Sequence, residues 1–194
     1  MKNLVLIALL FVIFSAKAQT TKPIDGFLGI KFGSSAAQVT EALKARGATI
    51  KAGQTAASIG FLNLSLGNRK VATLYVHFVN DKAFEALFMF MPELEAQTID
   101  YYNALVKDIE GVYGAGKPYK NFKQPYTDGD GYEITAIKTG NANYETSWDS
   151  GDNTAWVSIV TNKDIPLIVR LVYSDSKLSQ LYKDQQKEKN KSEF

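Results

Sequence analysis

The stretch TIDYYNALVKDIEGVY, Thr98–Tyr113, predicts the helix around which the rest of the chain is arranged. Its apolar residues recur at steps of three and four, which places them on one face of a helix. That face comprises Ile99, Tyr102, Leu105, Val106, Ile109, Val112 and Tyr113. Thr98 can cap the first turn, and the negative charge of Asp100 interacts favourably with the positive N-terminal end of the helix dipole. Gly114 stands at the position where a left-handed C-terminal cap is expected. We expect this helix to cover a sheet.

The segment before this helix carries one further helix and several strands. Residues 36–46 follow Ser35, which forms a capping-box pattern with Gln38, and we expect a helix there. Alternating apolar residues predict strands at 26–32, 59–66, 71–79 and 83–91. In the last of these strands, Phe84, Phe88 and Phe90 are expected on one face.

The segment after the helix repeats the pattern. A loop rich in glycine, proline and aspartate is expected at 114–131. Strands are predicted at 132–138, 142–149, 154–161 and 165–173, with turn residues between them. A last helix begins near Ser176, and its polar continuation, 183–194, is expected to be a frayed tail.

This order of elements predicts an α+β fold in which helices pack on an antiparallel meander sheet. The two helices that precede strand groups have N-terminal caps at Ser35 and Thr98, so the chain admits two tandem helix-plus-meander units. An ordinary α+β layer without internal duplication fits the pattern equally well. The sequence leaves both arrangements open, and it predicts a single domain over 19–182.

The first 18 residues have the pattern of a signal peptide. Lys2 precedes an unbroken apolar run, 4–14, and Ala16-Lys17-Ala18 then offers the small residues that signal peptidase reads. The apolar run is shorter than the roughly 20 residues that span a membrane. Cleavage is expected before Gln19. The mature chain is therefore predicted to be periplasmic or secreted, with no membrane span.

Charge and cysteine content exclude several chemistries. The full sequence has 22 basic and 20 acidic residues, but Lys2 and Lys17 lie in the predicted signal peptide, which leaves a formally neutral mature chain. A neutral chain lacks the basic excess that nucleic-acid binding requires, so no nucleic-acid partner is expected. The sequence contains no cysteine, which rules out disulfides and thiolate catalysis.

Two stretches carry a resemblance to a known fold type. GIKFGSSAAQVTEALKARG, 29–47, and YNALVKDIEGVYGAGKP, 102–118, are similar to the helices of small exported bacterial domains. These domains are of the β-lactamase-inhibitor-protein and outer-membrane-assembly-lipoprotein type. The resemblance implies a binding or scaffold role without catalytic residues, and it assigns no site. This chain lacks the lipoprotein cysteine of the assembly factors, so we do not expect their membrane-tethered role.

Individual residues with catalytic or ligand-binding chemistry are few. His77 is the single histidine and is predicted to lie partly exposed in a strand. Asp128-Gly129-Asp130-Gly131 resembles the start of a calcium loop, but an EF-hand needs glutamate at the position that Thr139 occupies. We predict a turn there, and no catalytic residue, metal or cofactor. Of Trp148 and Trp156, we expect one in the core and one on the surface.

The glycine-rich loop contains the one cluster that suggests recognition. Aromatic side chains lie on or beside this loop with lysines and aspartates among them, an arrangement that can stack on a sugar, a peptide or a protein. The candidate partner-binding residues are Tyr119, Phe122, Tyr126, Asp128, Asp130 and Tyr132. The alternative is that the aromatic residues cover the edge of the core.

Three functional hypotheses follow. The first is an exported, non-catalytic binding or scaffold protein of the bacterial cell envelope that recognises a protein, peptide or glycan through this loop and an exposed sheet face. The second is a carboxylate-dependent hydrolase that acts on envelope or dietary polymers. The third, an inhibitor or immunity protein for an exported enzyme, follows from the resemblance alone. The single histidine, the missing cysteine and the absence of a Gly-x-Ser-x-Gly elbow favour the first hypothesis.

Overall fold

The computed structural model describes residues 22–162 and 165–192. The predicted signal peptide and its cleavage site lie outside these residues. Among the helices of the described part, none is both long and apolar enough to cross a membrane.

Within the described residues, a single antiparallel sheet of eight strands dominates the fold, which confirms the predicted α+β class. Its strands are, from one edge to the other, β3 (Thr49–Ile50), β4 (Ser58–Leu62), β7 (Thr73–Val79), β8 (Lys82–Phe90), β12 (Ile165–Asp175), β11 (Asn153–Asn162), β10 (Ala142–Ser150) and β9 (Lys117–Phe122). Two small hairpins stand apart from it: β1 (Gly26–Phe27) with β2 (Ile30–Lys31), and β5 (Leu64–Leu66) with β6 (Arg69–Val71).

The strand order divides the sheet into two halves of matching topology. In each half, a helix precedes the strands of the sheet, which start at an outer edge and proceed strand by strand to the centre. The halves meet where β8 pairs with β12 in antiparallel orientation, with Phe88 opposite Leu171. The two halves are thus related as by a two-fold axis normal to the sheet. This topology favours the tandem-unit arrangement over an ordinary α+β layer.

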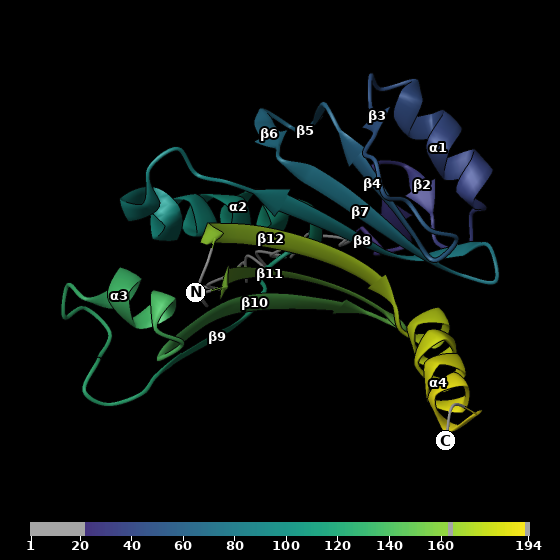
Figure 1. Ribbon diagram of the computed structural model, residues 1–194. Helices are drawn as coiled ribbons and strands as arrows, with labels where there is room; N and C mark the ends of the chain where they lie inside the picture. The colour runs from purple at the N-terminus through teal and green to yellow at the C-terminus, as the bar shows by residue number, and fades with distance from the viewer. Residues whose placement is uncertain (1–21, 163–164, 193–194) are drawn as a thin grey trace, which may run out of the picture.

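The helices lie on opposite faces of the sheet. Side chains of α1 (Ala36–Lys44), α2 (Thr98–Tyr113) and α3 (Glu133–Lys138) share one apolar core with the inward-facing strand residues. In contrast, α4 (Ser176–Ser192) packs on β8 from the other face, where Tyr182 stacks on Phe84 at 5.1 Å between ring centroids. Figure 1 shows α1 and α2 on one side of the sheet and α4 on the other, at one end.

The central helix α2 begins and ends where the sequence predicts. The helix lies on strands β11 and β12, and its buried face contains Tyr102, Leu105 and Ile109, with Tyr102 reaching Thr146 of β10. Val112 is 45% exposed and lies outside that face. The predicted cap at Thr98 is wrong. A 3-10 turn, Glu95–Gln97, leads into the helix, and the Thr98 hydroxyl donates to the Glu95 carbonyl.

Two predicted strands are interrupted by residues with positive φ. The segment 26–32 is a hairpin rather than one strand, because Leu28 and Gly29 adopt φ of 50° and 81° and reverse the chain. The segment 59–66 is divided at Asn63, whose φ is 62°, into β4 and β5. Asparagine tolerates this left-handed conformation better than most residues. Because the apolar residues alternate on both sides of Asn63, the sequence pattern alone predicts one continuous strand.

Two further predictions in the second half are wrong. The segment 132–138 is the short helix α3, in which the adjacent residues Ala136 and Ile137 are both buried, a pattern that an alternating strand cannot produce. The segment 114–131 is not all loop, because Lys117–Phe122 forms the edge strand β9. The polar sequence KPYKNF conceals a strand, since edge strands tolerate lysine and proline.

The predicted common face of Phe84, Phe88 and Phe90 is also corrected. The pairing of β7 with β8 shifts at His77 and Phe78, so one extra residue is inserted in β8. The insertion turns Phe84 to the face that α4 covers, while Phe88 and Phe90 remain in the core. The polar segment 183–194, expected to be frayed, continues α4 as an exposed helix as far as Ser192.

Candidate functional site

The predicted recognition loop does not form one surface. Tyr119 lies in the middle of the edge strand β9, opposite Glu145, and is 56% exposed. Phe122 is partly buried and packs edge-on against Tyr144, with 5.9 Å between ring centroids. Tyr126 is also partly buried against the core. Of these three aromatic residues, Tyr119 alone presents its ring to solvent.

The two aspartates of the loop have structural partners. Asp128 forms an ion pair with Lys120, whose ammonium also lies over the Tyr144 ring. Asp130 accepts hydrogen bonds from the backbone N–H groups of Thr127 and Tyr132, and these bonds lower the pKa of its carboxyl group. The predicted turn is therefore present at Asp130, and it leads into α3 rather than a strand. Tyr132 itself is 64% exposed.

The remaining singled-out residues lie on opposite faces of the sheet. Trp148 is buried in the core, where its indole N–H donates to the Gly114 carbonyl. Trp156 is partly exposed on the other face. This agrees with the prediction of one tryptophan in the core and one on the surface. His77 is also partly exposed, and its Nδ1 lies 2.8 Å from Oε1 of Glu85 on the neighbouring strand.

The sheet face opposite α1 and α2, which we call the open face, carries an ordered array of side chains. Antiparallel pairing brings one residue of each successive strand into register, in a row that crosses the sheet. The central row joins four large side chains from β7, β8, β12 and β11, namely Tyr75, Leu87, Val172 and Trp156. Its neighbours bury Val172 to 2% exposure, while the other three remain partly exposed.

Two mainly polar rows flank this apolar row. The row nearer α4 crosses from β4 to β10 through Ser58, His77, Glu85, Ser174, Thr154 and Asp149. The row on the other side contains Thr73, Met89, Arg170, Ser158, Glu145 and Tyr119. Arg170 is held in place there, because its Nε donates to the Ser158 hydroxyl at 2.7 Å. The open face is thus an apolar strip between polar margins.

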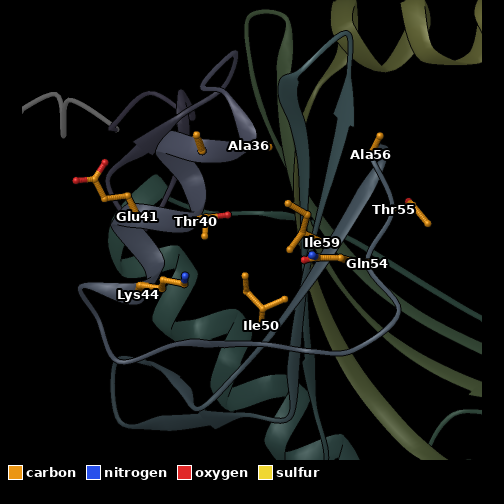
Figure 2. A pocket seen from close by; sticks show the side chains of 10 residues that line it. Ala36, Thr40, Glu41, Lys44, Ile50, Gln54, Thr55, Ala56 and Ile59 are labelled. Atoms are coloured by element: carbon orange, nitrogen blue, oxygen red, sulfur yellow. The ribbon is translucent and has the colours of Figure 1, made fainter.

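A groove lies on the opposite, helix-bearing side of the sheet. It lies between α1 and the segment from β3 to β4 and has a volume of about 830 Å³. Figure 2 shows Ile50 and Ile59 pointing into it from the strands, facing Thr40 and Lys44 of α1. Its lining is mainly aliphatic and contains no histidine, so the groove offers shape and apolar contact rather than chemistry.

In the described part of the chain, no three His, Cys, Asp or Glu side chains converge as metal ligands would. Comparison with known proteins finds no matching family model, no matching curated protein and no matching solved structure. Functional interpretation therefore depends on the geometry of the open face.

Most of the open face cannot be recognised in the amino-acid sequence. The alternation of Tyr75 and His77 with buried residues was visible, but it indicates only that these side chains share a face. That Leu87, Val172 and Trp156 stand beside Tyr75 depends on the register of three strand pairs. The sequence does contain one indication of the strip, because each of its four strands carries a large apolar or aromatic residue at the outward position concerned.

Proposed function

We propose that this chain is an exported, non-catalytic binding module of the cell envelope, which recognises a protein, peptide or glycan through the open face. The observation that carries the proposal is the apolar strip Tyr75–Leu87–Val172–Trp156 between two polar rows. Contiguous apolar side chains rimmed by polar ones mark interaction sites on soluble proteins. Their spacing of about 4.8 Å per strand suits an elongated ligand that lies across the strands.

The arrangement of the helices supports the same proposal. α2 buries its apolar face in the core on the other side of the sheet, and α4 covers the open face at one end through Phe84 and Tyr182. Tyr75, Leu87 and Trp156 therefore stay partly accessible, whereas Val172, between Leu87 and Trp156, is buried. Tyr75 is fixed at one end of it, since the Lys51 ammonium donates to its hydroxyl at 2.6 Å. A rigid sheet with pre-positioned side chains lowers the entropic cost of binding.

The test is retention of envelope material by the immobilised mature chain, 19–194. Leu87→Gln and Trp156→Gln remove apolar surface from the strip, whereas Val112→Gln and Tyr132→Gln make the same kind of change at exposed positions outside the open face. We expect the strip variants to lose the retained material and the controls to keep it, with thermal melting used to verify folding. Equal retention by strip and control variants contradicts the proposal.

The export part of the proposal has its own test. The apolar run at 4–14 and the Ala16-Lys17-Ala18 sequence support cleavage before Gln19. N-terminal sequencing of the protein recovered from periplasm or medium should start at Gln19. A protein that retains Met1 contradicts it.

A further inference from the structure

A second hollow lies on the open face where α4 meets the sheet. It has a volume of about 420 Å³ and is lined by strands β8, β11 and β12 and by one side of α4. Its lining includes Glu85, Trp156 and Ser174 of the sheet and Ser179, Gln180 and Lys183 of α4. The hollow is therefore the place where the apolar strip ends at Trp156 and the adjacent polar row begins.

The lining combines one aromatic ring with many hydrogen-bonding groups. Trp156 offers a partly exposed indole, whose electron-rich face attracts the weakly positive C–H groups of a ligand. Hydroxyl, amide, carboxylate and ammonium groups surround it, and hydroxyl groups both donate and accept hydrogen bonds. A ligand that matches this lining has an apolar C–H face and a rim of hydroxyl groups. Saccharides have this form.

The charges of the lining favour an uncharged saccharide. Among the described lining residues, Glu85 and Lys183 carry opposite charges that balance. Glu85 is also oriented, because His77 Nδ1 lies 2.8 Å from its Oε1, which leaves the other carboxylate oxygen to accept hydrogen bonds from a ligand. An oriented carboxylate beside an aromatic ring suits paired hydroxyl donors. It does not suit a phosphate or another carboxylate.

The same lining favours binding over hydrolysis. Glycoside hydrolysis commonly uses two carboxylates about 5 to 10 Å apart. Among the described residues that line the hollow, Glu85 is the one carboxylate. On this basis, and resting on the proposed function, we infer that the hollow between Trp156 and α4 binds a neutral saccharide unit of an envelope or environmental glycan.

The test uses purified neutral tetrasaccharides of glucose, N-acetylglucosamine, mannose and xylose at millimolar concentration, with the mature chain. Calorimetry measures the affinity, and tryptophan fluorescence reports contact with Trp156, because Trp148 is buried. We expect at least one tetrasaccharide to bind. Trp156→Ala should weaken that binding about tenfold, a loss that one aromatic contact can account for. Glu85→Gln, which keeps the shape of the side chain, should also weaken it.

Two comparisons make the outcome decisive. Tyr132→Ala removes an aromatic ring that is 64% exposed and directly precedes α3, which lies at the other end of the sheet from α4 (Figure 1), and it should leave the affinity unchanged. Gln180→Ala tests α4 at an exposed position where misfolding is not expected, and it should weaken binding. No binding of any of the four tetrasaccharides overturns the inference. Binding that Trp156→Ala and Gln180→Ala leave unchanged overturns it as well.

The result also separates this inference from the proposed function. If strip variants lose retained envelope material but no tetrasaccharide binds, the open face binds a ligand of another class, and only the saccharide inference fails. If strip variants and controls retain envelope material equally, the proposed function fails. Saccharide binding that depends on Trp156 in that case would place the site in the hollow alone.

Discussion

At the scale of single residues, a hydrogen bond inside the core links the central helix to the sheet. The hydroxyl groups of Tyr102 on α2 and Thr146 on β10 lie 2.7 Å apart, and both side chains are buried. Burial raises the pKa of the Tyr102 phenol, so it remains protonated and available for this bond. The ring also packs edge-on against Tyr144.

We predict that this pair is energetically coupled. Tyr102→Phe leaves the buried Thr146 hydroxyl without its partner, which costs about 1–3 kcal/mol of unfolding free energy. The double variant Tyr102→Phe/Thr146→Val removes both polar groups and should cost less than the two single changes together. Urea denaturation of the four proteins measures the coupling, and strictly additive losses would refute it.

A single residue, Pro118, also affects the exposed edge of the sheet. The Lys123 N–H donates to the Asn141 carbonyl, so in the β9–β10 pairing the odd-numbered residues of β9 direct their backbone groups toward β10. The backbone groups of the even-numbered residues then point away from the sheet; these residues are Pro118, Lys120 and Phe122. Proline has no N–H group, and it therefore removes one outward donor from the exposed edge. This protects β9 against pairing with another chain.

At the scale of elements, α2 is stabilised by a narrower face than its sequence suggests. Ile109 is buried, Val106 is partly buried, and Val112 is largely exposed. The helix contacts β11 and β12, and Val112 stands on the part of it that remains uncovered. Helical periodicity predicts which residues share a side, but the sheet below decides how much of that side is covered.

We predict a graded response to charge on this helix. Ile109→Asp places an unpaired carboxylate in the core and should cost several kcal/mol, a large part of a typical total of about 5–15 kcal/mol. Val106→Asp should cost less, and Val112→Asp should change stability by no more than about 0.5 kcal/mol. Thermal and urea denaturation measure the series. Equal losses at positions 109 and 112 would show that α2 does not pack in this way.

At the scale of the whole molecule, the junction between β8 and β12 joins the two halves into one sheet. The pairing runs from Phe90 opposite Val169 to Glu85 opposite Ser174. Each half on its own would expose this central strand edge together with the apolar residues around it. Long apolar edges of this kind promote association with other chains.

We predict that the halves are not independent domains. The fragments 22–92 and 93–194, prepared separately, should be unfolded or self-associated, whereas the two together should reassemble into a species of the intact chain's size. Size-exclusion chromatography with light scattering distinguishes these results, with the intact chain as the reference. A folded, monomeric single half would contradict the prediction.

Local patterns in the sequence determined the α+β class, the bounds of α2, the capping box of α1 and the long strands. Each depends on side chains close together in the chain, whose periodicity and turn residues suffice. The same reasoning failed at β9, α3 and Phe84. The strand β9 forms because it lies at the sheet edge, α3 is a short amphipathic helix, and Phe84 is turned outward by a bulge in the strand pairing. None of these three causes produces a recognisable pattern in the neighbouring sequence.

The tertiary structure alone decided the candidate site. Glu85, Trp156 and Lys183 are far apart in sequence and meet because β8, β12 and β11 are adjacent and α4 folds back over their ends. Strand register sets which outward side chains become neighbours, and a shift of one residue would turn the apolar strip toward the core. Register is fixed by core packing over the whole sheet. For that reason the sequence could indicate that a face is exposed, but not which residues meet on it.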